Sequence, residues 1–139
     1  MSDDFEGKVA LVTGSGRGLG RACAQIFARE GAAVVVVDLN AEDGAETVRL
    51  IEGAGGRAQF VSANVASESE VRNMVEEAKS VFGGLDCAVN NAVRFIGRNP
   101  LAAINKEDWD RATEGRIPGV FLCTEYERQW SSTRGGAAL

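Results

Sequence analysis

The sequence predicts an α/β fold in which helices cover both faces of a parallel sheet. Short apolar segments alternate along the chain with longer segments whose apolar residues recur every three or four positions. Residues 34–37 are four consecutive valines, which suits a strand buried on both faces of a parallel sheet. The connections are short, and strands joined through helices by right-handed crossovers run parallel. We expect residues 1–139 to form one domain.

The first strand is expected over residues 8–13 and the first helix over 19–30, where Gly31 ends it. The turn between them contains three glycines, and a fourth, Gly20, lies at the start of the helix. This order suits a dinucleotide pyrophosphate, because N–H groups at a helix N-terminus bind an anion and missing side chains let the backbone approach it. A surface turn that needs left-handed backbone is the plainer alternative.

The second strand is expected over residues 33–38, and Asn40 is a candidate N-cap for the helix that follows. Helical spacing places Ala45, Val48 and Ile51 on the inner face of this helix. Three glycines within the next five residues then end it.

The third strand is expected over residues 58–63 and the fourth over 85–90. The helix between them opens at Ser67, and Glu70 three residues later gives the spacing of a capping box. Its apolar stripe is expected to consist of Val71, Met74, Val75, Ala78 and Phe82.

Beyond the fourth strand, Asn105 is a candidate N-cap for a helix that begins near Lys106. Pro118 is expected to break this helix, because proline lacks an N–H group and clashes with the carbonyl four residues back. A second helical piece is expected over residues 119–130, and residues 131–136 are expected to form a loop.

Composition excludes several classes of function. The net charge of −5 and the lack of a basic run argue against a nucleic-acid partner. The apolar runs are too short to cross a bilayer, and the acidic start of the chain is unlike a signal peptide, so a cytoplasmic location is expected. Cys23, Cys87 and Cys123 are expected to be buried thiols; with no histidine and no paired cysteines, no metal site is expected.

The glycine turn carries the pattern T-G-x-x-x-G-x-G at Thr13, Gly14, Gly18 and Gly20. In this the chain resembles the short-chain dehydrogenase/reductase family, over a length that matches about the first half of a typical member. The resemblance implies a Rossmann-type doubly wound parallel sheet, truncated after about four strands in the order 3-2-1-4. It also implies an NAD(P)-dependent oxidoreductase that transfers hydride between alcohols and ketones.

The turn and the resemblance together predict a dinucleotide site, with NAD as the cofactor. A carboxylate at Asp38 can accept hydrogen bonds from the adenosine ribose and would repel the 2′-phosphate of NADP, although it could also be a simple turn aspartate. Arg17 could pair with that phosphate, but NADP remains the less favoured cofactor. The expected cofactor-binding residues are Thr13, Gly14, Ser15, Arg17, Gly18, Leu19, Gly20, Asp38, Leu39, Asn64, Val65, Asn90, Asn91 and Ala92.

Two further segments match the family in part. Asn64 and Val65 occupy the place where the family usually has Asp-Val or Asp-Leu beside the adenine, and the amide oxygen of Asn64 can still accept a hydrogen bond. Residues 90–93 match the family's Asn-Asn-Ala-Gly in three positions of four. Val93 replaces the glycine, which would cost energy and narrow the cleft if the position requires a positive φ.

No catalytic residue is expected in this chain. The resemblance implies a catalytic asparagine at the position that Arg116 occupies here, and a serine, tyrosine and lysine further along. Tyr126 is the only tyrosine and is followed four residues later by Trp130 rather than by lysine, so it is expected to be a partly packed helix residue. Hydride transfer requires an acid/base group, so the chain as given is expected to bind NAD without turnover.

Two alternatives to a truncated oxidoreductase remain at this point. The chain could be a non-catalytic NAD-binding or interaction module that a partner chain completes, with two copies joined through the last helices or the exposed strand edge. A frameshift or premature stop in the source sequence would also yield such a chain.

Overall fold

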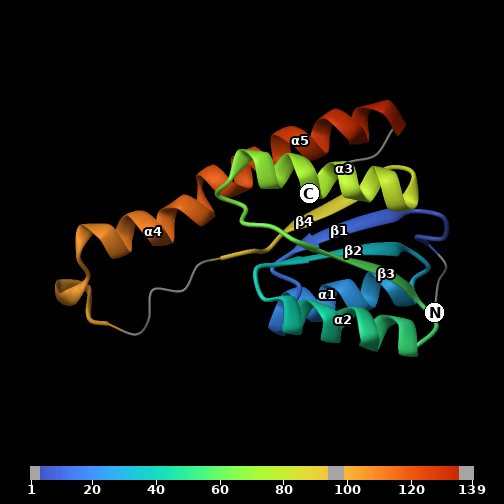
Figure 1. The fold of residues 1–139 in the computed structure, drawn as a ribbon, viewed down its shortest axis with the longest axis horizontal. Helices are drawn as coiled ribbons and strands as arrows, with labels where there is room; N and C mark the ends of the chain where they lie inside the picture. The colour runs from blue at the N-terminus through green and yellow to red at the C-terminus, as the bar shows by residue number, and fades with distance from the viewer. Residues whose placement is uncertain (1–3, 94–98, 135–139) are drawn as a thin grey trace.

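The computed structural model describes residues 4–93 and 99–134, and it contains every expected element with ends shifted by a few residues (Figure 1). The elements are β1 (Val9–Thr13), α1 (Gly18–Arg29), β2 (Ala33–Asp38), α2 (Ala41–Gly53), β3 (Arg57–Ser62), α3 (Glu68–Phe82), β4 (Cys87–Asn90), the short 3₁₀ helix η1 (Leu101–Ala103), α4 (Lys106–Arg116) and α5 (Pro118–Arg134).

The four strands form one parallel sheet in the order β3-β2-β1-β4, which confirms the expected topology. Thr13 at the end of β1 lies opposite Val37 of β2 on one side and Asn90 of β4 on the other. Val37 in turn pairs with Val61 of β3. The carboxyl ends of the strands therefore meet at one edge of the sheet, where ligands bind in open α/β folds.

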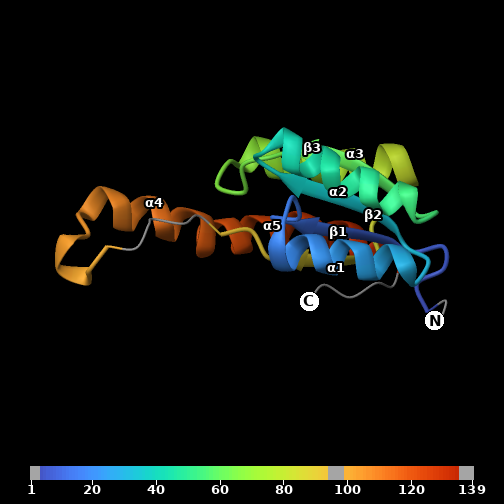
Figure 2. The same cartoon turned by 90° about the horizontal axis from the view of Figure 1, so that it is seen from below.

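Helices α1 and α2 cover one face of the sheet, and α3 and α5 cover the other (Figures 1 and 2). Side chains of a strand alternate between faces, so β1 and β2 contribute to two separate cores. Leu11 and Val35 pack with Met74 and Val75 of α3, whereas Val12 packs on the face of α1 and α2. Burial on both faces explains why β2 is apolar at consecutive positions, as the sequence predicts.

The inner face of α2 differs from the prediction. Val48 and Ile51 pack in the core as predicted, but Ala45 is exposed, and Gly44 and Thr47 are buried. The ring of Phe60 in β3 occupies the space where a Cβ at Gly44 would lie. A glycine at this position lets α2 pack closely on the ring.

The predicted capping box at the start of α3 is wrong. Ser67 is the N-cap residue, but its hydroxyl caps no backbone N–H and lies 3.2 Å from the hydroxyl of Ser69. The carboxylate of Glu70 accepts a hydrogen bond from the N–H of Asn64 at 3.2 Å, so it is directed at the preceding loop. In contrast, the side chains of Asn40 and Asn105 cap α2 and α4 as predicted.

The helical segment after residue 105 breaks where the sequence predicts. Helix α4 ends at Arg116, Ile117 follows, and Pro118 is the first residue of α5. Proline is tolerated at the first position of a helix, because the N–H group that it lacks would make no hydrogen bond within the helix there. Helix α5 continues to Arg134, so the expected loop at residues 131–134 is wrong, and residues 135–136 lie outside the described part. Helix α4 extends away from the sheet (Figure 1).

The cysteines lie within the packed body, with Cys123 buried and Cys23 and Cys87 half-buried. Burial raises the pKa of the Cys87 thiol to about 11 and that of Cys123 to about 12, so both are protonated at neutral pH. Among residues 4–93 and 99–134, no group of side chains could hold a metal ion. In the same residues, no helix combines the length and the hydropathy needed to cross a membrane.

Candidate functional site

The glycine turn between β1 and α1 lies at the carboxyl edge of the sheet. Gly14 and Gly18 have φ values of 66° and 60°, a left-handed backbone that disfavours other residues. Gly20 is required for a different reason, because a Cβ there would overlap the carbonyl oxygen of Gly14 and lie 2.7 Å from the side-chain nitrogen of Asn91. The turn therefore needs these glycines for both conformation and close packing.

Hydrogen bonds to β2 fix the first half of the turn. The N–H of Ser15 donates to the carbonyl of Val37 at 3.0 Å, and the N–H of Gly16 donates to Oδ2 of Asp38 at 2.9 Å. The buried Ser15 hydroxyl donates to the carbonyl of Val12 at 2.7 Å and accepts from the N–H of Val37 at 3.0 Å. Ser15 therefore supports the turn from behind, and its side chain does not face a ligand.

The N-terminus of α1 is open to an anion. Arg17 is its N-cap residue, its side chain makes no capping hydrogen bond, and no acidic residue lies in the first turn. The first N–H groups of an α-helix have no partner within the helix, and the helix dipole adds positive potential there. Helix α3 also lacks a side-chain cap, but its first turn carries Glu68 and Glu70. Of these two uncapped N-termini, only that of α1 has no acidic side chain in its own first turn.

Thr47 and Arg21 hold the turn from α2 and α1. The buried Thr47 hydroxyl donates to the carbonyl of Ser15 at 2.8 Å and accepts from Nε of Arg21 at 2.9 Å. Nη2 of Arg21 donates to the carbonyl of Gly16 and, at 3.3 Å, to that of Asp43. Because the carbonyls of Ser15 and Gly16 are both hydrogen-bonded, the peptide groups of the turn cannot rotate without breaking these hydrogen bonds.

Replacing Thr47 with valine, which has nearly the same shape, is expected to destabilise the chain by about 1–3 kcal/mol, because the buried carbonyl of Ser15 loses its donor. Thr47→Ser keeps the hydroxyl and should retain most of the stability. Urea unfolding measures both effects. Thr113→Val serves as the matched control, since the Thr113 hydroxyl bonds only carbonyls of its own helix in the structure. An equal loss in the two valine variants would contradict this role of Thr47.

Two carboxylates lie beside the turn. Asp38 ends β2, and its two oxygens accept hydrogen bonds from the N–H groups of Gly16 at 2.9 Å and Asn40 at 3.0 Å. Asp43, which the sequence analysis did not single out, lies 3.7 Å by Oδ2 from Nε of Arg17. Arg17 therefore points toward Asp43 rather than Asp38. The spacing of Asp43 from the Asn40 N-cap, in the first turn of α2, is the sequence signal that could have identified it.

The segment after β4 is bound to the glycine turn. The hydroxyl oxygen of Thr13 accepts hydrogen bonds from the N–H groups of Asn91 and Ala92, each at 3.0 Å. The side-chain amide of Asn91 donates to the carbonyls of Thr13 at 3.2 Å and Gly14 at 3.3 Å. Thr13 and Asn91 thus connect β1, the turn and β4 into one rigid edge.

Asn90 points to the opposite side, into the core beneath α5. Its side-chain nitrogen donates to Oε2 of Glu127 at 2.9 Å, and Glu127 is only 1% exposed. Oδ1 of Asn90 and Oε1 of Glu127 are both buried and have no partner. Burial raises the pKa of the Glu127 carboxyl to about 7, against the opposing effect of the Asn90 hydrogen bond. A protonated Glu127 could donate to Asn90 Oδ1 and satisfy both oxygens.

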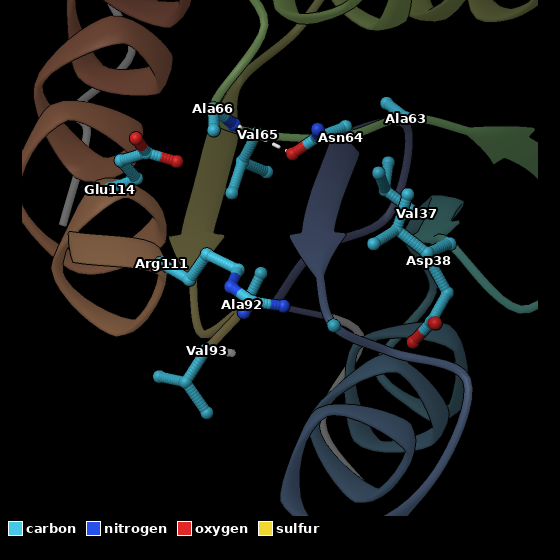
Figure 3. Close-up of a pocket in the computed structure, with 12 residues that line it drawn as sticks. Val37, Asp38, Ala63, Asn64, Val65, Ala66, Ala92, Val93, Arg111 and Glu114 are labelled. Atoms are coloured by element: carbon cyan, nitrogen blue, oxygen red, sulfur yellow. Dashed lines mark hydrogen bonds between the residues drawn. The ribbon is translucent and has the colours of Figure 1, made fainter. Parts of the chain in front are cut away.

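A cleft opens at this edge of the sheet, with about 620 Å³ of empty space when the part open to solvent is counted. Figure 3 shows Asp38 on one side of it and α4 on the other. The cleft brings together the expected residues Gly14, Asp38, Leu39, Asn64, Val65 and Ala92. It is also lined by Val93, which was expected to narrow it, and by Val37, Ala63, Ala66, Arg111 and Glu114, which the sequence does not predict to be in a cofactor site.

Comparison with known proteins bears on this site. The family model described as short chain dehydrogenase matches residues 8–137. The chain belongs to the short-chain dehydrogenase family. It is 38% identical over 139 residues to an uncharacterized oxidoreductase of Thermotoga maritima, covering 97% of this chain and 52% of that protein. It is 37% identical over 139 residues to a cyclohexanol dehydrogenase of Acinetobacter sp. (strain SE19), covering all of this chain and 55% of that protein.

Solved structures of short-chain dehydrogenases show the same fold. A short chain dehydrogenase from Mycobacterium avium superimposes with a TM-score of 0.85 at 32% identity, over 96% of this chain and 50% of that one. A short-chain type dehydrogenase/reductase from Mycobacterium marinum gives a TM-score of 0.91 at 28% identity, over 98% of this chain and 56% of that one. The chain thus spans about half the length of the relatives it matches.

Asn64 and Val93, at two segments that match the family in part, differ in detail from the expectation. Oδ1 of Asn64 already accepts a hydrogen bond from the N–H of Ala66 at 3.0 Å (Figure 3), which leaves one acceptor position for a ligand. Val93 is exposed at the rim, and among the described residues no residue other than glycine has a positive φ. The replacement of the family glycine by Val93 therefore imposes no left-handed backbone.

Tyr126 lies away from the cleft, at the contact between α5 and α3. Its hydroxyl donates to Oε1 of Glu68 at 2.6 Å and accepts from Nη2 of Arg72 at 3.1 Å. The guanidinium of Arg72 also lies over the ring, 5.5 Å from its centre. Tyr126 is thus a partly packed helix residue, as expected from the sequence, and Arg116 is exposed at the end of α4.

Proposed function

We propose that these 139 residues bind NAD, and that the oxidoreductase to which they contribute transfers hydride between this cofactor and an alcohol or ketone. The observation that carries the proposal is the open N-terminus of α1, uncapped and free of acidic residues in its first turn, beside a glycine turn at the carboxyl edge of the sheet. A pyrophosphate needs this combination of N–H groups, positive helix dipole and close backbone approach. The neighbouring cleft provides room for the adenosine part.

Asp38 and Asp43 support NAD over NADP. A 2′-phosphate placed beside Asp38 would meet two carboxylates, the Arg17 guanidinium is directed at Asp43, and that of Arg21 is bound to the backbone carbonyls of Gly16 and Asp43. Ribose hydroxyl groups, in contrast, can donate to the free acceptor positions of Asp38. Arg17 is largely exposed, so an ion pair that it forms, with Asp43 or with a phosphate, is weak. The repulsion between Asp38 and the 2′-phosphate therefore dominates.

Replacing Asp38 with alanine is expected to reduce the preference for NAD over NADP by about tenfold or more, equal to about 1.4 kcal/mol. The variant loses the acceptor for the ribose hydroxyls and the repulsion of the 2′-phosphate together. Isothermal titration with each cofactor measures the ratio of dissociation constants. Glu42→Ala is the control, because Glu42 is an exposed carboxylate four residues after Asp38, in the first turn of α2. Tighter binding of NADP by the unaltered chain would contradict the assignment.

We propose that the acid/base chemistry lies outside these residues. The Tyr126 hydroxyl is hydrogen-bonded to Glu68 and Arg72 of α3, and Tyr126 does not line the cleft. Arg116 stands where the family resemblance implies an asparagine. The residues of this chain bind and orient the cofactor, which supplies the hydride, while the proton transfer requires groups from the rest of the oxidoreductase.

A second candidate function is a binding module completed by another chain. In the described residues β4 pairs only with β1, which leaves the other edge of β4 without a partner strand. Ile117 and Phe121 at the α4–α5 junction are also exposed, at 72% and 66%. Exposed edges and apolar patches favour association. Size-exclusion chromatography with light scattering distinguishes the two candidates, since a monodisperse dimer or heteromer favours the module.

A further inference from the structure

We propose that the planar face of the Arg111 guanidinium stacks on the adenine base in the cleft, which makes Arg111 a determinant of adenine recognition. This inference rests on the proposed binding of a dinucleotide and names the residue of α4 that would contact its base. Three features of the structure carry it: the position of Arg111 in the cleft, the pairing of its edge, and the apolar character of the wall that faces it.

Arg111 extends from α4 across the mouth of the cleft toward Ala92, on the side opposite Asp38 (Figure 3). Asp38 is the expected partner of the adenosine ribose, so a base attached to that ribose would point away from Asp38 and toward α4. Arg111 is the only cationic side chain among the described residues that line the cleft. It is therefore placed where the base, rather than the ribose, would lie.

The edge of this guanidinium is already engaged. Nη2 of Arg111 lies 3.3 Å from Oε1 of Glu107 and 3.3 Å from Oδ1 of Asp108, both on its own helix. These pairs hold one edge of the group and offset its charge. They leave its flat face available, and an arginine can bind carboxylates through its edge while stacking through its face. A lysine at this position could not do both.

The cleft offers an adenine little else to bind. Its wall is formed largely by small or apolar side chains, including Ala63, Val65 and Ala92, which can cover one face of a flat base. Oδ1 of Asn64 already accepts from Ala66. A guanidinium plane on the other face would complete a sandwich, and stacking of this kind contributes substantially to the binding of unpaired bases.

The test measures dissociation constants for NAD, AMP and nicotinamide mononucleotide with four forms of the chain: unaltered, Arg111→Met, Arg111→Lys and Arg116→Met. Nicotinamide mononucleotide lacks adenine, so it reports binding that does not involve this base. Arg116 is exposed on the same helix and does not line the cleft, so its replacement is a matched control for the loss of charge. Circular dichroism verifies that each variant is folded.

Both replacements of Arg111 are expected to weaken the binding of NAD and AMP by about five- to tenfold and to leave the binding of nicotinamide mononucleotide unchanged. Arg116→Met should match the unaltered chain with every ligand. Full retention of AMP affinity in Arg111→Lys would overturn the inference, because charge alone would then explain binding. So would unchanged NAD affinity in Arg111→Met. If the unaltered chain binds no NAD, the proposed function fails and the inference fails with it.

Discussion

Replacing Gly20 with alanine is expected to reduce NAD binding to an undetectable level and to destabilise the chain by about 1–3 kcal/mol. The added Cβ would overlap the carbonyl oxygen of Gly14 and crowd the side chain of Asn91, so the backbone of the turn must move. That carbonyl cannot move freely, because the turn is bound to β2, α2 and the segment after β4. Isothermal titration and urea unfolding measure the two losses.

Gly53→Ala is the matched control. Gly53 is the last residue of α2, and a Cβ there would meet no atom within 4 Å. The better helix propensity of alanine should leave this variant as stable as the parent or slightly more so. Unchanged cofactor affinity in Gly20→Ala would show that the turn does not approach the ligand closely.

Glu127→Gln is expected to stabilise the chain by about 3 kcal/mol at pH 8 and to have little effect at pH 5. The amide of glutamine can accept from Asn90 and donate to it, which satisfies both buried oxygens that lack a partner in the unaltered chain. Urea unfolding at several pH values measures the difference.

The direction of the pH dependence follows from the raised pKa of Glu127. Its value is about 7 in the folded chain, against an ordinary value of 4.5. The folded state therefore holds the proton more tightly, and the resulting stability is present below about pH 4.5 and is lost as the pH rises through 7. Glu125→Gln, an exposed change two residues earlier in α5, should keep the pH dependence. If the Glu127→Gln variant also kept the pH dependence of stability, Glu127 would not be the source of that dependence.

Local sequence patterns predict much of the fold because the interactions that they describe are local. Asn40 and Asn105 cap the helices that follow them, and the pattern of four valines marks β2. The capping box at Ser67 failed because Glu70 also lies within reach of the Asn64 N–H, which the residue spacing does not reveal. On the inner face of α2, Val48 and Ile51 are as predicted, but Ala45 is not, because the ring of Phe60 from β3 selects Gly44 instead.

In the candidate site, too, local sequence predicts some residues and misses others. Asp38 and the glycine turn are adjacent to recognisable elements, so their places at the sheet edge follow from the order of strand, turn and helix. Thr47 lies 31 residues from the carbonyl of Gly16, and Glu127 lies 37 residues from Asn90. Such pairings depend on how helices pack across the sheet. No periodicity in the sequence distinguishes Thr47 from an ordinary helix residue.

The contact between Tyr126 and α3 offers a spectroscopic use. Because the sequence contains a single tyrosine, biosynthetic incorporation of fluorotyrosine would give one fluorine resonance. That resonance would report on the Tyr126 hydroxyl between Glu68 and Arg72, and hence on whether α5 is docked against α3. The docking of this helix could thus be followed during ligand titration or unfolding without a mutation or an attached dye.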